Sequence, residues 1–164
     1  MFVTSSEANK MLAKLAIDKE TVLSDEAEKR TFRAAIQEDP EKLRPDYSFS
    51  VTQEKIDSIN RRVMEIKHKL NLFNANTVVY NGLTIDQVLV RMPQLQHQKA
   101  KLQRMMLVSE KSRAGIIGNI IDYTYANYYP KEAKKAFNEV SIEIDQMQLA
   151  LDTVNNTQKF EIDD

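Results

Sequence analysis

The chain has 164 residues, of which 42% are apolar and 29% are charged, with no Cys, no Trp and two His. This composition predicts one soluble, helix-rich domain. The 23 basic and 24 acidic residues give a net charge of -1, which argues against binding driven by bulk charge to nucleic acid or membrane surfaces. The absence of Cys excludes disulfides, thiolate zinc sites and a cysteine nucleophile.

The first helix is expected over about residues 5–37. Thr4 to Glu7 reads T-x-x-E, the pattern of a capping box, in which the first and fourth residues hydrogen-bond each other's backbone. Apolar residues then recur at helical spacing through Leu15 and Leu23 as far as Ile36. One long helix is the first interpretation. Ser24 is a good helix-capping residue, so a break near Ser24 is the alternative.

A loop is expected over residues 38–51, because Pro40 and Pro45 lie in a highly charged stretch with little apolar periodicity. A second helix, over about residues 52–74, carries apolar side chains at spacings of three and four. These are Ile56, Ile59, Val63, Ile66, Leu70 and Phe73. Heptad spacing of this kind is typical of helices that pair as coiled coils.

A short hairpin is expected near residues 77–84, because Asn81-Gly82 is a strong signal for a two-residue turn. Thr84 to Gln87 is a second capping-box pattern and begins a third helix, over about residues 85–112. Pro93 lies well inside this helix, where the missing backbone donor is expected to kink it.

A strand is expected near residues 120–125, where β-branched and aromatic residues are dense, after a turn around Gly115 and Gly118. Four tyrosines lie close together in this region: Tyr123, Tyr125, Tyr128 and Tyr129. They are candidates for a ligand wall or an oligomer interface. The alternative is that they pack on the helices and staple the start of the next one.

The fourth helix is expected over about residues 130–154, with Pro130 in its first turn. Its heptad stripe consists of Ala133, Phe137, Val140, Ile144, Met147, Leu151 and Val154. Residues 84–114 contain six basic and two acidic residues, whereas the chain from Asn138 onward contains one basic and seven acidic residues. This complementarity favours close pairing of the third and fourth helices. A last strand is expected near residues 157–162.

No constellation of catalytic or cofactor-binding residues is visible. Glu65 and His68 have the Glu-x-x-His spacing of a di-iron bundle, but no second copy is present, since Gln94 stands three residues before His97. No phosphate-binding glycine motif occurs. We therefore expect no enzymatic activity, no metal and no cofactor.

Two basic patches on the helices have the charge needed to contact phosphates. The first consists of Arg61, Arg62, Lys67, His68 and Lys69, and the second of Lys99, Lys101 and Arg104. Basic residues that flank a heptad stripe usually serve pairing between helices, so no nucleic-acid partner is expected. The start of the chain does not read as a signal peptide, and no apolar run approaches the roughly 18 residues of a membrane span, so the expected location is cytoplasmic, with no membrane partner.

Two runs of sequence carry a resemblance to a known group: FNANTVVYNGLTIDQVLVRM (residues 73–92) and QMQLALDTVNNTQKFEI (residues 146–162). They resemble a small bacterial helical family of unknown function, many members of which carry the automatic name septicolysin. The shared residues mark helix ends and turns, so no catalytic residue is carried over. The family name implies a secreted pore-forming cytolysin.

The sequence thus predicts a mainly α fold: an antiparallel long-helix, coiled-coil bundle with a small β element, in a single elongated domain over residues 1–164. We expect a structural or protein-interaction module that forms a homo-oligomer through its heptad stripes. The alternatives are a membrane-active, pore-forming protein and a weak nucleic-acid-binding protein. The residues expected in the packing and oligomer seam are Ile56, Ile59, Val63, Ile66, Leu70, Phe73, Phe137, Val140, Ile144, Met147 and Leu151.

Overall fold

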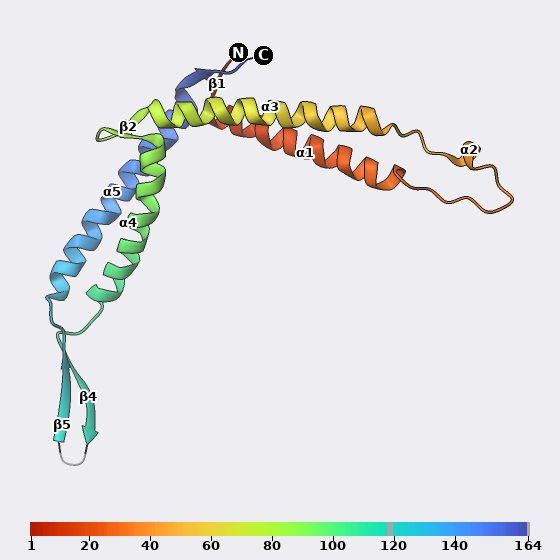
Figure 1. Cartoon of the computed structure of the whole chain (residues 1–164). Helices are drawn as coiled ribbons and strands as arrows, with labels where there is room; N and C mark the ends of the chain where they lie inside the picture. The colour runs from red at the N-terminus through yellow and green to blue at the C-terminus, as the bar shows by residue number, and fades with distance from the viewer. Residues whose placement is uncertain (118–119, 164) are drawn as a thin grey trace. The chain divides into compact units, whose positions relative to one another are not determined.

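The computed structural model describes residues 1–117 and 120–163, and it confirms a mainly helical fold with small antiparallel sheets (Figure 1). In chain order the described elements are β1 (Phe2–Thr4), α1 (Ser5–Lys29), α2 (Pro40–Leu43), α3 (Phe49–Asn76), β2 (Val78–Tyr80), β3 (Leu83–Thr84), α4 (Ile85–Met106), β4 (Lys111–Ile117), β5 (Ile120–Tyr125), α5 (Pro130–Thr157) and β6 (Lys159–Glu161).

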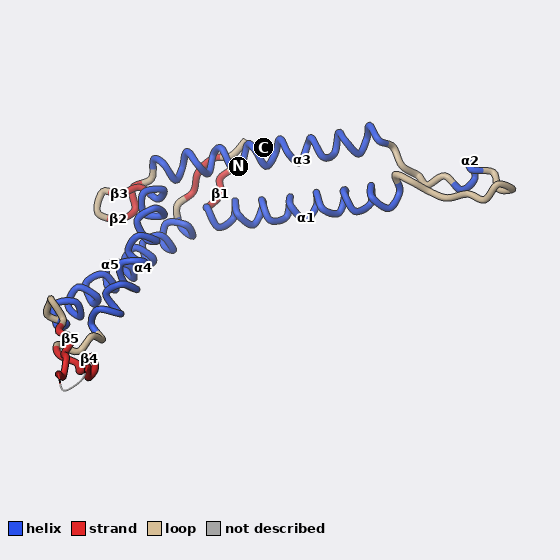
Figure 2. The backbone as a smooth tube through the Cα atoms, turned by 60° about the horizontal axis from the view of Figure 1, so that its bottom comes forward, coloured by secondary structure: helices blue, strands red, loops and turns tan. Residues whose placement is uncertain are grey.

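The chain divides into two compact units. The first unit contains Met1–Phe73 together with the residues from Asn155 onward, and the second contains Asn74–Val154. The second unit is therefore an insertion within the sequence of the first. Figure 2 shows the helices and strands of both along the backbone.

In the first unit, α1 and α3 run side by side in opposite directions (Figures 1 and 2). The strands β1 and β6 form an antiparallel pair in which Val3 lies opposite Phe160. A core cluster of Val3, Ala8, Ile66 and Ile162 is buried where this small sheet meets the two helices. The sheet thus covers the start of α1, and the burial of its apolar side chains supplies the main stabilisation there.

The predicted capping box at the start of α1 is present. The Thr4 hydroxyl accepts from the Glu7 backbone nitrogen at 3.2 Å, and the Glu7 carboxylate accepts from the Thr4 backbone nitrogen at 2.7 Å. Because these hydrogen bonds favour the ionised carboxylate, they hold the pKa of Glu7 below its ordinary value of 4.5. The cap therefore fixes the first turn of α1 immediately after β1.

The helix α1 continues through Ser24 and ends at Lys29, so both the predicted end at residue 37 and the alternative break at Ser24 are wrong. Lys29 pairs with Asp25 at 2.6 Å in the last turn. Residues 31–37 are exposed and not helical, and Ile36 is fully exposed. The apolar periodicity gives no helix here because Ile36 finds nothing to pack against, and the Phe32 ring lies 5.4 Å from the Arg44 guanidinium and not on an apolar helix face.

The predicted loop over residues 38–51 is shorter than expected, because it contains α2 and because α3 begins at Phe49. Pro40 occupies the first turn of α2, and Asp39 caps it. The Glu26 carboxylate accepts from the Tyr47 hydroxyl at 2.8 Å and from the Gln53 amide at 3.0 Å. The hydrogen bond from the Tyr47 hydroxyl to the Glu26 carboxylate raises the pKa of Tyr47, because the bond exists only while the hydroxyl keeps its proton.

In the second unit, α4 and α5 are antiparallel neighbours (Figure 1). The predicted hairpin before α4 is confirmed: β2 and β3 pair, and the turn residues Asn81 and Gly82 both have positive φ, at 44° and 82°. Positive φ at both positions is what a two-residue Asn-Gly turn requires. At the start of α4, the Gln87 side chain accepts from the Thr84 backbone nitrogen at 3.0 Å.

Three other predicted bounds need correction. The third helix ends at Met106 instead of 112, because the chain from Lys111 is the strand β4. Pro93 lies inside this helix, as the sequence predicted. The fourth helix runs to Thr157 instead of 154, and α3 runs to Asn76 instead of 74.

The predicted strands near residues 120–125 and 157–162 are present as β5 and β6. Their partners were not predicted. The strand β5 pairs with β4, so Gly115, expected in a turn, lies inside a strand next to a register shift after Arg113. Gly118, the other residue of the expected turn, lies outside the described residues.

Candidate functional site

The heptad stripe of α5 lies inside the second unit. Val140, Ile144, Met147 and Leu151 are buried, and Phe137 is half-buried. The helix α4 contributes Ile85, Val88 and Leu95 to the buried residues of this unit. These side chains are already covered within one chain, and they hold α4 and α5 together.

Polar contacts also join α4 to α5, as the charge pattern predicted. Arg91 and Glu143 form an ion pair at 3.8 Å, and the Lys99 ammonium lies 5.5 Å from the centre of the Phe137 ring. The Tyr80 hydroxyl, from β2, donates to the Gln146 side chain on α5 at 2.9 Å. These exposed contacts fix the pairing and its register more than they stabilise it.

The heptad stripe of α3 lies in the first unit. Ile66 is fully buried in the core cluster, whereas Ile56, Ile59, Val63 and Leu70 are half-buried. Phe73 stacks on Phe160 of β6, with ring centres 4.8 Å apart. Only Ile66 of this stripe is therefore fully covered within the chain, and the other five side chains remain partly accessible.

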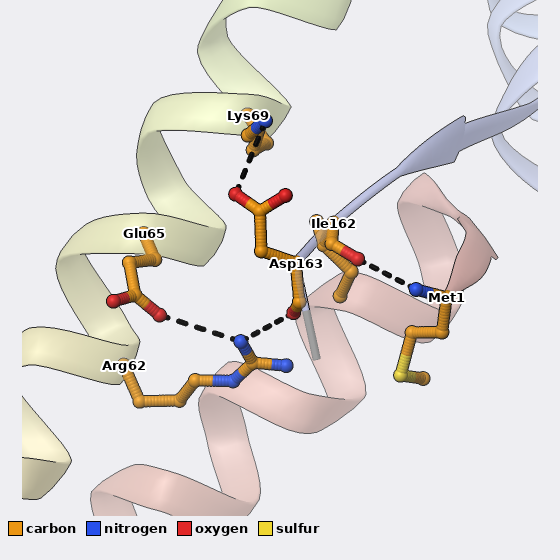
Figure 3. Close-up of polar contacts among 6 residues, drawn as sticks. All are labelled: Met1, Arg62, Glu65, Lys69, Ile162 and Asp163. Carbon is orange, nitrogen blue, oxygen red and sulfur yellow. Dashed lines mark hydrogen bonds and ion pairs between the residues drawn. The ribbon is translucent and has the colours of Figure 1, made fainter.

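The first basic patch is partly engaged in the first unit, as Figure 3 shows. The Arg62 guanidinium contacts the Glu65 carboxylate at 3.3 Å and donates to the Asp163 backbone oxygen at 2.6 Å. The Lys69 ammonium lies 3.3 Å from the Asp163 carboxylate. Met1 and Ile162 exchange two backbone hydrogen bonds. The contacts of Arg62 and Lys69 thus occupy two of the cations that this patch would use to bind a phosphate.

In the described part of the chain, no group of three or more His, Asp or Glu side chains lies close enough together to hold a metal ion. Glu65 pairs with Arg62. Across these same residues, no helix combines the length and the apolar character that crossing a bilayer demands.

The structure divides the tyrosine cluster into three environments. Tyr128 is half-buried and donates to the Met105 backbone oxygen at 2.8 Å, so it ties the end of α4 to the segment before α5. Tyr129 is 70% exposed. Tyr123 and Tyr125 lie on β5, with ring centres 6.4 Å apart. The Lys111 ammonium lies 4.0 Å from the Tyr123 ring centre and 5.5 Å from that of Tyr125.

The strand β5 of the β4–β5 hairpin carries several exposed apolar side chains next to one another. Every residue of β5 is exposed, and Ile120, Ile121, Tyr123 and Tyr125 are 69%, 47%, 45% and 62% exposed. In the described structure β4 and β5 pair only with each other. An isolated two-stranded hairpin is marginally stable in water. Its exposed isoleucine and tyrosine side chains are therefore the strongest candidate for an interaction surface.

Sequence reasoning found β5 but missed β4. The signal was present, because Gly118-Asn119 separates two Ile-Ile pairs, and a Gly-Asn dipeptide between apolar runs indicates a two-residue hairpin turn. These two residues lie outside the described part of the chain. The helical apolar pattern that continued past Met106 obscured the signal.

Comparison with known proteins finds a likeness in fold alone. No protein-family model matches the chain, and no curated protein matches it. Among solved structures, a functionally unknown conserved protein from Corynebacterium diphtheriae matches with a TM-score of 0.59 and 14% identity, over 98% of this chain and 100% of that one. The TM-score shows that the two proteins share a fold, and a likeness at 14% identity concerns the fold alone.

Proposed function

We propose that this protein is a non-catalytic structural or protein-interaction module that self-associates and works in the cytoplasm. The observation that carries the proposal is the exposed β4–β5 hairpin, with two isoleucines and two tyrosines uncovered on β5. Exposed apolar surface concentrated on one element is typical of a protein contact. Tyrosine is also among the residues that contribute most at such contacts.

The proposal includes coiled-coil packing of α3 with α1 and of α5 with α4. The apolar residues of α3 and α5 recur at heptad spacing and lie on the buried or half-buried sides of these helices. Since the α5 stripe is covered within the chain, we place self-association on the hairpin and not on that stripe. We further propose membership of the small bacterial family that the sequence runs of residues 73–92 and 146–162 resemble.

Light scattering coupled to size exclusion tests the proposal, because it measures mass independently of shape. We expect a mass of at least two chains of 18.9 kDa each at high concentration, and we expect this mass to fall towards that of one chain on dilution. A mass of one chain at the highest soluble concentration would contradict self-association. In that case, capture of a different protein by the purified chain becomes the next experiment.

A further inference from the structure

We propose that two copies of this chain join edge to edge through β5, in an antiparallel pairing centred on Tyr123. This inference rests on the self-association proposed above and names its surface and its register. The hairpins of the two copies then form one four-stranded antiparallel sheet, with the two β5 strands at its centre.

The strand β5 has an open edge. Among the described residues, β5 is paired along one side only, with β4. The backbone N–H and C=O groups on the other side of a strand form a template for a further strand. A third and a fourth strand also convert a marginal hairpin into a sheet of ordinary stability.

The two edges of the hairpin differ in charge and in regularity. The strand β4 carries Lys111 and Arg113, and its register shifts between Arg113 and Gly115. Charged residues and bulges are the features by which natural proteins block an edge strand. The strand β5 has one charged residue, Asp122, and no Lys, Arg or Pro, and the extra residue at the register shift belongs to β4. The open edge is therefore β5.

The register of the junction is limited by the symmetry of the pair. Side chains alternate between the two faces along a strand, and residues directly opposite each other across two strands lie on the same face. The two-fold axis of a symmetric pair of β5 strands must therefore pass between one residue and the same residue of the second copy. An axis at Asp122 or at Tyr123 lets five of the six residues of each β5 strand face a residue of the other copy, and an axis at any other residue pairs fewer. A centre at Asp122 places two carboxylates directly opposite each other, which is destabilising.

A centre at Tyr123 avoids that repulsion. It places Tyr123 opposite Tyr123 of the second copy, Ile121 opposite Tyr125, and Asp122 opposite the Thr124 hydroxyl. One face of the sheet then carries a continuous row of isoleucine and tyrosine from both copies, and aromatic pairs of this kind stabilise a sheet. No like charges face each other across the junction. The strand is thus complementary to itself, which is what a second copy as partner requires.

The test is a charge exchange at the centre of the junction, using Tyr123→Lys and Tyr123→Asp. Each variant alone places like charges opposite each other, so we expect its dissociation constant to rise about tenfold or more. An equimolar mixture places the introduced lysine opposite the introduced aspartate, so we expect the mixture to recover the oligomer. The matched control is Tyr129→Lys, an exposed tyrosine outside β5, which should keep the wild-type mass.

The outcomes separate this inference from the proposed function. A monomeric wild-type chain overturns both. A wild-type oligomer that both Tyr123 variants retain overturns the β5 junction and leaves self-association standing. If both variants dissociate but their mixture does not recover, Tyr123 does not face itself and the β5 edge meets a different surface. Dissociation of Tyr129→Lys to the same extent also overturns the assignment.

A second pair of variants keeps the test valid if substitution at Tyr123 disturbs the fold. Far-ultraviolet circular dichroism would show such a loss. The register places Ile121 opposite Tyr125, so Ile121→Lys mixed with Tyr125→Asp should associate more tightly than either variant alone. Equal association of the mixture and the single variants would overturn the register.

Discussion

The guanidinium of Arg62 on α3 donates to the backbone oxygen of Asp163, 101 residues later in the chain, at 2.6 Å. Together with Lys69 it holds the segment after β6 against α3. Two half-buried cations thus anchor the segment after the strand that covers Val3 and Ile66. Several measurable consequences depend on contacts of this kind.

Replacing Arg62 by alanine should loosen the attachment of β6. We expect a loss of about 1 kcal/mol, because a hydrogen bond from a charged donor is removed at a partly exposed site. Urea denaturation followed by circular dichroism measures this loss. The neighbouring Arg61→Ala is the control, and equal losses for both variants would count against a specific role for Arg62.

Replacing Ile144 by aspartate should disrupt the second unit. Ile144 is buried, so the introduced carboxylate would lie among apolar side chains without a partner. We expect a loss of more than about 3 kcal/mol, at the upper end of single-residue effects. Thermal unfolding is the measurement, and exposed Ile142→Asp is the matched control. An unchanged melting temperature for Ile144→Asp would refute the assigned position of the stripe.

Replacing Tyr128 by phenylalanine should weaken the end of α4. The hydroxyl donates to the Met105 backbone oxygen, so its removal leaves that carbonyl without this donor. We expect a loss of about 1 kcal/mol and faster amide exchange in the last turn of α4. Tyr129→Phe should have no effect, and a comparable loss in that variant would show that the hydrogen bond is not the cause.

The stability of the α1 cap should depend on pH through Glu7. The folded state lowers the pKa of Glu7 below 4.5, so the carboxylate contributes stability above that pH and loses it as the pH falls through the folded-state pKa. Glu7→Gln removes this dependence. We expect the melting temperatures of the wild type and this variant to converge as the solution is acidified below pH 4.5. A constant difference at all pH values would mean that ionisation of Glu7 does not matter.

The sequence predicted best the elements whose signals are local or whose periodicity is matched by a packing partner. The Asn81-Gly82 turn and the Thr4 capping box depend on residues within a few positions of one another, and both appear in the structure. The stripe of α5 is buried because α4 provides an apolar surface for it. In these cases local preference and tertiary packing agree.

The failures come from partners that are distant in sequence or missing. Phe32 and Ile36 continue the apolar pattern of α1, but the helix ends before them, Ile36 is fully exposed, and the Phe32 ring lies against the Arg44 guanidinium. The strand β1 has only three residues and becomes a strand because β6 pairs with it from the far end of the chain. Periodicity carries no information about such a partner. The open edge of β5 likewise depends on which side of the strand β4 occupies.

The pairing of β1 with β6 also constrains the order in which the protein can form during synthesis. The helices and hairpins of residues 74–154 are contiguous, so they can fold as soon as they leave the ribosome. The cluster around Val3, Ala8 and Ile66 must wait for Ile162, which emerges after the whole inserted unit. A chain stalled before β6 would therefore present an uncovered apolar start of α1, which makes that segment a natural point of recognition for chaperones.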